Sequence, residues 1–149
     1  MIKKVINLYV LSLAIVVMPV VHADKDHDVR EKIYLNKAEK HHLLSEMRLF
    51  LSSVQQIVKG VSEDDLKHVA VYAKKSGKAG GVGAPSTLGA KLPKEFRMLG
   101  SKTHTQFDQL ALDASDLEDG AHALTQLSDL MKNCMSCHAT YKIELVDEE

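Results

Sequence analysis

The only two cysteines of this 149-residue chain lie three positions apart near its end, in the run Cys134-Met135-Ser136-Cys137-His138. A Cys-x-x-Cys-His run is the attachment signature of c-type haem. Both thiols can add to the two vinyl groups of the haem, and the next imidazole then stands where its nitrogen can bind the iron. The motif therefore predicts one covalent haem c, attached at Cys134 and Cys137, with His138 as the proximal iron ligand.

Other uses of a Cys-x-x-Cys pair fit the chain less well. A thioredoxin-like dithiol needs a strand–helix–strand pattern, and the sequence shows no clear strands. A zinc site needs four ligands, so scattered histidines would have to complete the set. A disulfide between residues three apart closes almost no loop and adds little stability. A haem-free metal site of Cys134, Cys137, His138 and a distant histidine stays as an alternative hypothesis.

The first 23 residues have the pattern of a secretory signal peptide. Two lysines precede a mainly apolar stretch, 5–17, and small residues lead to Ala23. The apolar stretch is short for a membrane span of about 20 residues, and Pro19 breaks its end. We expect cleavage after Ala23, leaving residues 24–149 as one domain. The expected location is the periplasm, because bacteria attach c-type haem outside the cytoplasmic membrane.

The charge balance excludes some classes of partner. The whole chain has a formal net charge of −1, and loss of Lys3 and Lys4 with the leader makes this −3. The sequence has no cluster of lysines and arginines of the kind that binds nucleic acid. After the leader, the sequence has no second apolar run that is long enough to suggest a membrane span.

Apolar residues after the leader recur at helical steps of three and four. They predict four helices, over about 29–59, 62–77, 93–114 and 115–145, and hence an all-α antiparallel four-helix bundle. The Gly-rich residues 76–92 are expected to cross between helices without structure of their own. Capping boxes are predicted at Asp28 with Glu31 and at Ser115 with Glu118, and Pro93 suits the first position of the third helix.

Two predicted stripes place the haem motif in the bundle core. The inward stripe of the first helix is Leu44, Met47, Leu51, Val54 and Val58. The inward stripe of the last helix is Leu124, Leu127, Met131, Cys134, His138, Tyr141 and Leu145. Cofactors of helix bundles are held by side chains on such facing stripes.

With its motif on a fourth helix, the chain resembles the class II cytochromes c, the four-helix cytochrome c′ type. The resemblance rests on residues 134–142, because members of this class end in Cys-x-x-Cys-His-x-x-Tyr/Phe-Arg/Lys shortly before the terminus. It implies cofactor-binding positions at Tyr141 and Lys142. Tyr141 would pack against the edge of the ring, and Lys142 would lie near the proximal imidazole or a propionate, with an ordinary solvated lysine as the alternative.

In this class the residue opposite the proximal histidine comes from the first helix and decides the function. A methionine gives a six-coordinate electron carrier with a raised potential. A leucine or phenylalanine leaves the iron open to small gases. Met47 and Leu44 lie one turn apart on the inward stripe, so the sequence leaves Met47 as a candidate distal iron ligand without deciding between them.

Two further features carry expectations. His104 is expected to hydrogen-bond locally at the edge of the core, with a role in the haem pocket as the alternative. Leu43, Phe50 and Ile57 form a second stripe on the first helix that could serve a homodimer, or could simply cover the core.

The sequence thus predicts a periplasmic monohaem cytochrome that carries single electrons between redox proteins. The alternative is a five-coordinate, cytochrome c′-like protein that binds nitric oxide or other small gases. We expect no enzymatic activity, because no nucleophile, base and oxyanion donors are grouped in the sequence.

Overall fold

The computed structural model describes residues 27–81 and 83–146, so the predicted leader lies outside the described residues. The fold is mostly helical with one small sheet. Its elements in chain order are β1 Glu31–Leu35, α1 Lys37–Ser62, α2 Leu66–Lys75, the 3-10 helix η1 Lys78–Gly81, α3 Leu88–Lys91, α4 Lys94–Leu117, α5 Gly120–Thr140 and β2 Tyr141–Leu145.

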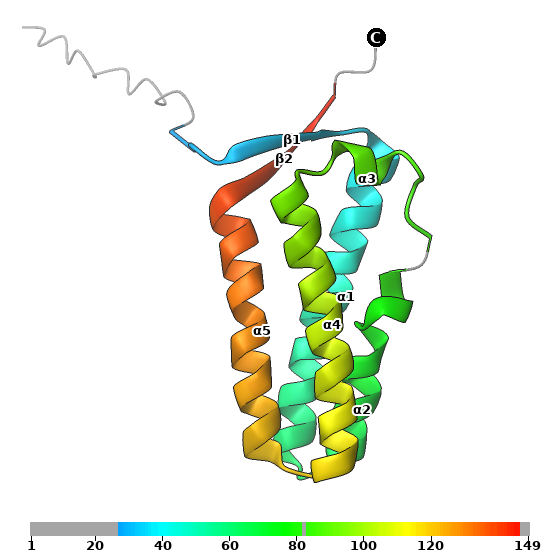
Figure 1. The fold of residues 1–149 in the computed structure, drawn as a ribbon, viewed down its shortest axis with the longest axis vertical. Helices are drawn as coiled ribbons and strands as arrows, with labels where there is room; N and C mark the ends of the chain where they lie inside the picture. The colour runs from blue at the N-terminus through cyan, green and yellow to red at the C-terminus, as the bar shows by residue number, and fades with distance from the viewer. Residues whose placement is uncertain (1–26, 82, 147–149) are drawn as a thin grey trace, which may run out of the picture.

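The four longer helices lie side by side, and each runs antiparallel to the one before it (Figure 1). Contacts join α1 to α2, α2 to α4, and α4 to α5, whereas α1 and α5 contact each other much less. The two strands lie across one end of the helices (Figure 1). The prediction of a mainly helical fold is therefore confirmed, and the small two-stranded sheet is a feature that it did not include.

The predicted first helix begins too early. Residues 31–35 form β1, in which Ile33 and Leu35 are buried and their neighbours are exposed. This period of two is that of a strand with one covered face. The helix begins only at Lys37, after an N-cap at Asn36 whose capping box with Glu39 replaces the predicted box at Asp28.

The predicted last helix ends too late. It stops at Thr140, and residues 141–145 form β2, which pairs in parallel with β1 from Glu31 opposite Tyr141 to Leu35 opposite Leu145. Tyr141 and Leu145 have the spacing of the helical stripe that precedes them, but they belong to this strand, so that the match in spacing is a coincidence. The first strand comes from before the helices and the second from after them, so neither has its partner nearby in sequence.

Within the predicted inward stripe of α1, Leu44, Met47 and Val54 are half-buried, but the most deeply buried stripe lies one residue away. Leu43 and Ile57 are buried, whereas Leu51 is 70% exposed and Val58 is 48% exposed. Phe50 stacks on Phe107 of α4. The second stripe of α1 therefore lies against the core of its own chain, as in the alternative that these residues cover the core.

Two connections also differ from expectation. The 76–92 crossover contains η1 and α3, and Leu88 within it is buried. The predicted capping box at Ser115 is wrong, because α4 continues through it to Leu117. Glu118 then adopts a left-handed conformation, and Asp119 caps α5 by accepting from the His122 N–H.

The buried apolar residues form two clusters. The far-end core lies away from the sheet and comprises Ile57, Leu66, Val69, Ala73, Phe107, Leu110, Ala111, Ala114, Ala123, Leu127 and Leu130. The sheet-end core comprises Ile33, Leu35, Leu43, Leu88, Phe96 and Tyr141. Among the described residues, no helix has the length and apolarity needed to cross a membrane.

Candidate haem site

A cavity of about 680 Å³ lies among α1, α4, α5 and the crossover. Its volume falls within the range of about 300–1,000 Å³ that is usual for ligand and cofactor sites. The apolar side chains along its walls include Leu43, Leu44, Met47, Leu51, Val54, Leu88, Leu92, Phe96, Phe107 and Met131. The cavity is thus mainly apolar and is built from elements far apart in the sequence.

The predicted haem motif lines this cavity. It occupies the last two turns of α5, where Cys134, Cys137 and His138 share one face by their spacing of three and four. Both thiols are free and half-buried, and His138 is exposed at the cavity wall. Burial raises the pKa of both thiols, and the neighbouring Cys134 adds to the effect at Cys137. The thiols are therefore neutral at ordinary pH.

The structure places both candidate distal residues on α1 at the same cavity. Met47 is partly buried against the sheet-end core, and Leu44 also lines the cavity. Met131 lines it too, but from α5, the helix that carries His138. The geometry brings the motif and the first helix to one cavity without choosing between Met47 and Leu44.

Tyr141 packs beneath the motif rather than along the cavity. It is the first residue of β2 and is buried, with its ring edge-to-face against Phe96 at 5.4 Å between centroids. Burial raises the pKa of its hydroxyl. Cys137 belongs to the same apolar cluster, so Tyr141 supports the motif from the sheet side.

The structure gives Lys142 a partner in the segment before β1. Its Nζ donates to the Asp28 carbonyl at 3.3 Å and lies 3.5 Å from the Asp28 carboxylate. Arg30 holds the same carboxylate through its Nε and Nη2 at 2.8 and 2.6 Å, which keeps the Asp28 pKa well below its usual value. Arg30 Nη1 also donates to the His138 carbonyl at 3.1 Å. This group therefore fastens the end of the motif to the start of the fold.

His104 lies on the cavity wall and also hydrogen-bonds locally. Its Nδ1 donates to the carbonyls of Ser76 and Gly77 at 2.9 and 3.2 Å, and its Nε2 lies 3.4 Å from the Glu46 carboxylate. Since both ring nitrogens face acceptors, the doubly protonated ring is favoured. The hydrogen bond to Glu46 accordingly raises the His104 pKa, against the opposing effect of burial.

Two arginines that no sequence pattern singles out also line the cavity, Arg48 of α1 and Arg97 of α4. Arg48 donates to the Ser45 hydroxyl at 2.9 Å. No carboxylate within salt-bridge distance is found for Arg48 among the described residues. Neither arginine belongs to a spacing motif, so only the fold, which brings α1 and α4 to one cavity, shows that they share a site.

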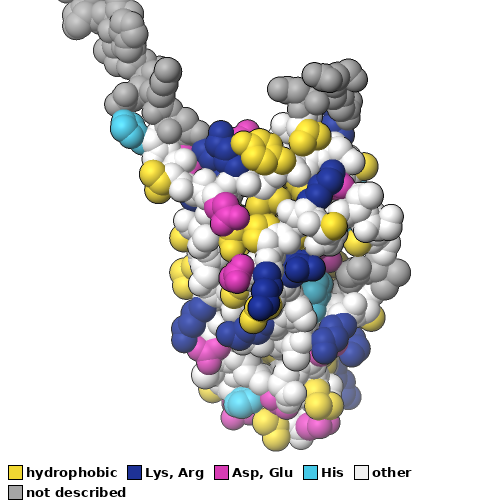
Figure 2. Space-filling view, turned by 45° about the horizontal axis from the view of Figure 1, so that its top comes forward, with side chains coloured by type: hydrophobic (Ala, Val, Ile, Leu, Met, Phe, Trp, Pro, Cys, Tyr) yellow, Lys and Arg dark blue, Asp and Glu magenta, His cyan; other side chains and the backbone are white. Residues whose placement is uncertain are grey.

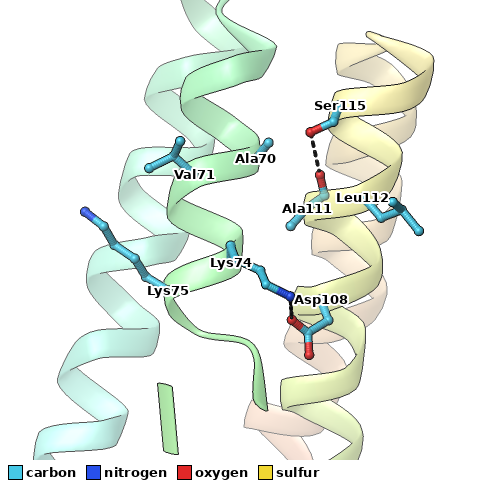
Figure 3. Close-up of a pocket in the computed structure, with 8 residues that line it drawn as sticks. All are labelled: Ala70, Val71, Lys74, Lys75, Asp108, Ala111, Leu112 and Ser115. Atoms are coloured by element: carbon cyan, nitrogen blue, oxygen red, sulfur yellow. Dashed lines mark hydrogen bonds and ion pairs between the residues drawn. The ribbon is translucent and has the colours of Figure 1, made fainter. Parts of the chain in front are cut away.

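A second hollow lies between α2 and α4 and has a volume of about 570 Å³. Figure 3 shows Lys74 of α2 reaching across it to Asp108 of α4, at 2.8 Å. None of the residues predicted for the haem site lines it. It is therefore not a candidate for the cofactor.

The donors at the larger cavity fit a covalent haem. Two half-buried thiols and an accessible imidazole stand on one wall of an apolar cavity, with a thioether on the helix opposite. Within residues 27–81 and 83–146, no three His, Cys, Asp or Glu side chains are grouped to hold a bare metal ion. No protein-family model, curated protein or solved structure matches this chain.

Proposed function

We propose that this chain is a periplasmic monohaem c-type cytochrome, built as a four-helix haem bundle, that carries single electrons between redox proteins. One observation carries the proposal: Cys134, Cys137 and His138 line the same apolar cavity as Met47 of the facing helix. A haem in this cavity would supply the one-electron redox chemistry.

The chain's own residues would attach, orient and shield that group. Cys134 and Cys137 would hold it through thioethers, and His138 would offer its imidazole nitrogen. Met47 would offer a thioether sulfur from the opposite wall, which favours a raised potential. Phe96 and Leu88 lie at the cavity with little exposed surface, so they would keep water from one side of it.

The test is to express the full chain in bacteria that attach c-type haem and to weigh the protein recovered from the periplasm under denaturing conditions. We expect the mass of residues 24–149 plus one haem. A variant with both Cys134→Ser and Cys137→Ser should show the polypeptide mass alone. If the wild-type protein also has only the polypeptide mass, the proposal is wrong.

Gas binding is a second candidate function, because Leu44 lines the same cavity wall as Met47. The absorption spectrum of the haem protein separates the two. Electron transfer predicts low-spin iron with a methionine–iron charge-transfer band that disappears in Met47→Leu. Met131→Leu is the matched control, since Met131 lines the cavity from the proximal helix. High-spin iron in the wild-type protein would favour the gas-binding function instead.

A further inference from the structure

The hollow between α2 and α4 has an exposed apolar side chain on each of its two helices. Val71 of α2 is 55% exposed and Leu112 of α4 is 53% exposed, and both line the hollow. Figure 3 shows them on opposite sides of the hollow, with Lys74 and Asp108 joining the two helices between them. Exposed apolar side chains on neighbouring helices are typical of protein-interaction sites.

The two helices that form the hollow carry charges of opposite sign. The helix α2 has no acidic residue, and its lysines are Lys67, Lys74 and Lys75. From residue 103 to its end at 117, α4 has no lysine or arginine, and its aspartates are Asp108, Asp113 and Asp116. The hollow therefore has one basic wall and one acidic wall.

The charged and apolar side chains have the same spacing on both walls. On α2 they follow at steps of four, as Lys67, Val71 and Lys75. On α4 they follow at the same steps, as Asp108, Leu112 and Asp116. Residues four apart lie on one helix face, so each wall has an apolar side chain between two charges of one sign.

The two faces are also level with each other. The helices run antiparallel, and the ion pair between Lys74 and Asp108, at 2.8 Å, fixes their relative height. It lies three residues after Val71 and four residues before Leu112, so the two apolar side chains have nearly the same height along the hollow. Lys67 and Asp116, one turn farther from the sheet, are then level as well.

We propose that these two faces join two copies of the chain in a symmetric homodimer whose two-fold axis runs along the hollow. Such an axis places α2 of each copy on α4 of the other, so that the basic face meets the acidic face. Val71 then meets the leucine at 112 of the second copy, and Lys67 meets its aspartate at 116. An axis across the hollow would place α2 on α2 and bring lysines together, so the charges select the first arrangement.

The pattern of charge favours a second copy over an unrelated partner. Asp108 already binds Lys74 of its own chain, but no ion pair of Lys67 or Asp116 is found among the described residues, and both are exposed. A partner must therefore present an acidic and a basic face side by side, each with an apolar side chain at its centre. A second copy has this arrangement by symmetry, because a two-fold contact uses the same surface on both subunits.

Acidic residues at the far end of the two helices limit the contact. They lie in the turns beyond Lys67 and Asp116, and they are Glu63, Asp64, Asp65, Glu118 and Asp119. Asp65 and Asp119 accept backbone hydrogen bonds as helix N-caps, and Glu63 forms an ion pair with Lys59. The remaining negative charge on both sides would be repulsive in the dimer. The contact should therefore end at the height of Lys67 and Asp116, and the dimer should be weak.

The test is sedimentation of the mature protein in the analytical ultracentrifuge at several protein and salt concentrations. We expect a reversible monomer–dimer equilibrium that shifts toward monomer as salt rises. Lys67→Glu and Asp116→Lys should each raise the dimer Kd by at least about tenfold, because symmetry places each reversed charge in the contact twice. An equimolar mixture of the two variants should dimerise like the wild-type protein, because both contacts of a mixed dimer again join opposite charges.

Two further variants separate the interface from general effects of charge and surface. Lys132→Glu reverses an exposed charge on α5, outside the hollow, and should leave the dimer Kd unchanged. Val71→Ser with Leu112→Ser should weaken the dimer at every salt concentration, since it removes apolar surface from the centre of both faces.

The outcomes that would overturn the dimer are distinct from those that would refute the proposed function. A wild-type protein that stays monomeric up to about 1 mM would overturn it. A dimer that the mixture of Lys67→Glu and Asp116→Lys fails to restore would assign the contact to another face, with the same consequence. The hollow and the haem cavity share no lining residue, so absence of covalent haem would refute only the proposed function.

Discussion

At the scale of single residues, Glu39 links the start of α1 to the crossover. Its carboxylate accepts from the Asn36 N–H at 2.9 Å, the Thr87 hydroxyl at 2.6 Å and Lys91 Nζ at 2.7 Å. The hydrogen bonds from Lys91 and then Thr87 lower the Glu39 pKa from 4.5 to about 2. The ionised form of this buried carboxylate is thus part of the folded structure.

We expect Glu39→Gln to lower thermal stability at pH 7, because the neutral amide cannot pair with Lys91. A depressed pKa contributes stability above the unfolded value of 4.5, and that contribution is lost as the pH falls toward about 2. The difference in melting temperature between wild type and variant should therefore shrink over this window. The exposed Asp116 provides a control, since Asp116→Asn should give a small difference with no such trend. A Glu39→Gln effect that stays constant from pH 7 to pH 2 would contradict the assignment.

The candidate site is partly readable from single residues in the sequence. Cys134, Cys137 and His138 are predictable because their chemistry depends on spacing along one chain segment. Arg30, which holds the His138 carbonyl from 108 positions away, carries no such signal. Contacts of this kind depend on which segments meet in space, and the sequence pattern does not contain that information.

At the scale of elements, α1 shows how a helix can be predicted while its buried face is not. The chain offers two apolar stripes displaced by one residue: Leu43 beside Leu44, Phe50 beside Leu51, and Ile57 beside Val58. Because both stripes have the same helical spacing, the spacing cannot show which of them is buried. Packing inside the bundle buries Leu43 and Ile57 most deeply and stacks Phe50 on Phe107. Of the other stripe, Leu44 is half-buried at the cavity, whereas Leu51 and Val58 are exposed.

The strand β1 can be tested by its alternation. Ile33 is 2% exposed, whereas the next residue, Tyr34, is 54% exposed. We expect Ile33→Ala to lower the free energy of unfolding by about 2–5 kcal/mol, since it removes a buried side chain. Tyr34→Ala should change it by within about 0.5 kcal/mol. Denaturant titration gives both values, and equal effects would argue that this segment is not a strand with one buried face.

At the scale of the whole molecule, the two ends of the helices are packed differently. The far-end core is a continuous apolar cluster in which Phe107, Leu110 and Leu130 have no exposed surface. The sheet-end core borders the haem cavity through Leu43, Leu88 and Phe96, whereas the far-end core reaches it at Phe107. Figure 2 shows hydrophobic side chains at the surface toward this end, with Lys and Arg among them. Stability should therefore be concentrated away from the site.

Hydrogen exchange tests this division. In the variant with Cys134→Ser and Cys137→Ser, which cannot attach a haem, we expect the slowest amide exchange around Leu110, Leu127 and Leu130, which are buried and do not line the cavity. Amides around Met47 and Leu88 should exchange faster. Local opening beside a cavity exposes less apolar surface to water, so its free-energy cost is smaller and it occurs more often. Uniform protection along the helices would show that the cavity does not weaken the sheet end.

The parallel pairing of β1 with β2 has a mechanical consequence. A pull between handles attached before Glu31 and after Leu145 would slide the two strands past each other along their length, because the strands point the same way. The hydrogen bonds between the two strands would then bear the load together, and would not break one at a time. Tension along the backbone would meet its main resistance at this two-stranded sheet, beside the segment that carries Cys134 and Cys137.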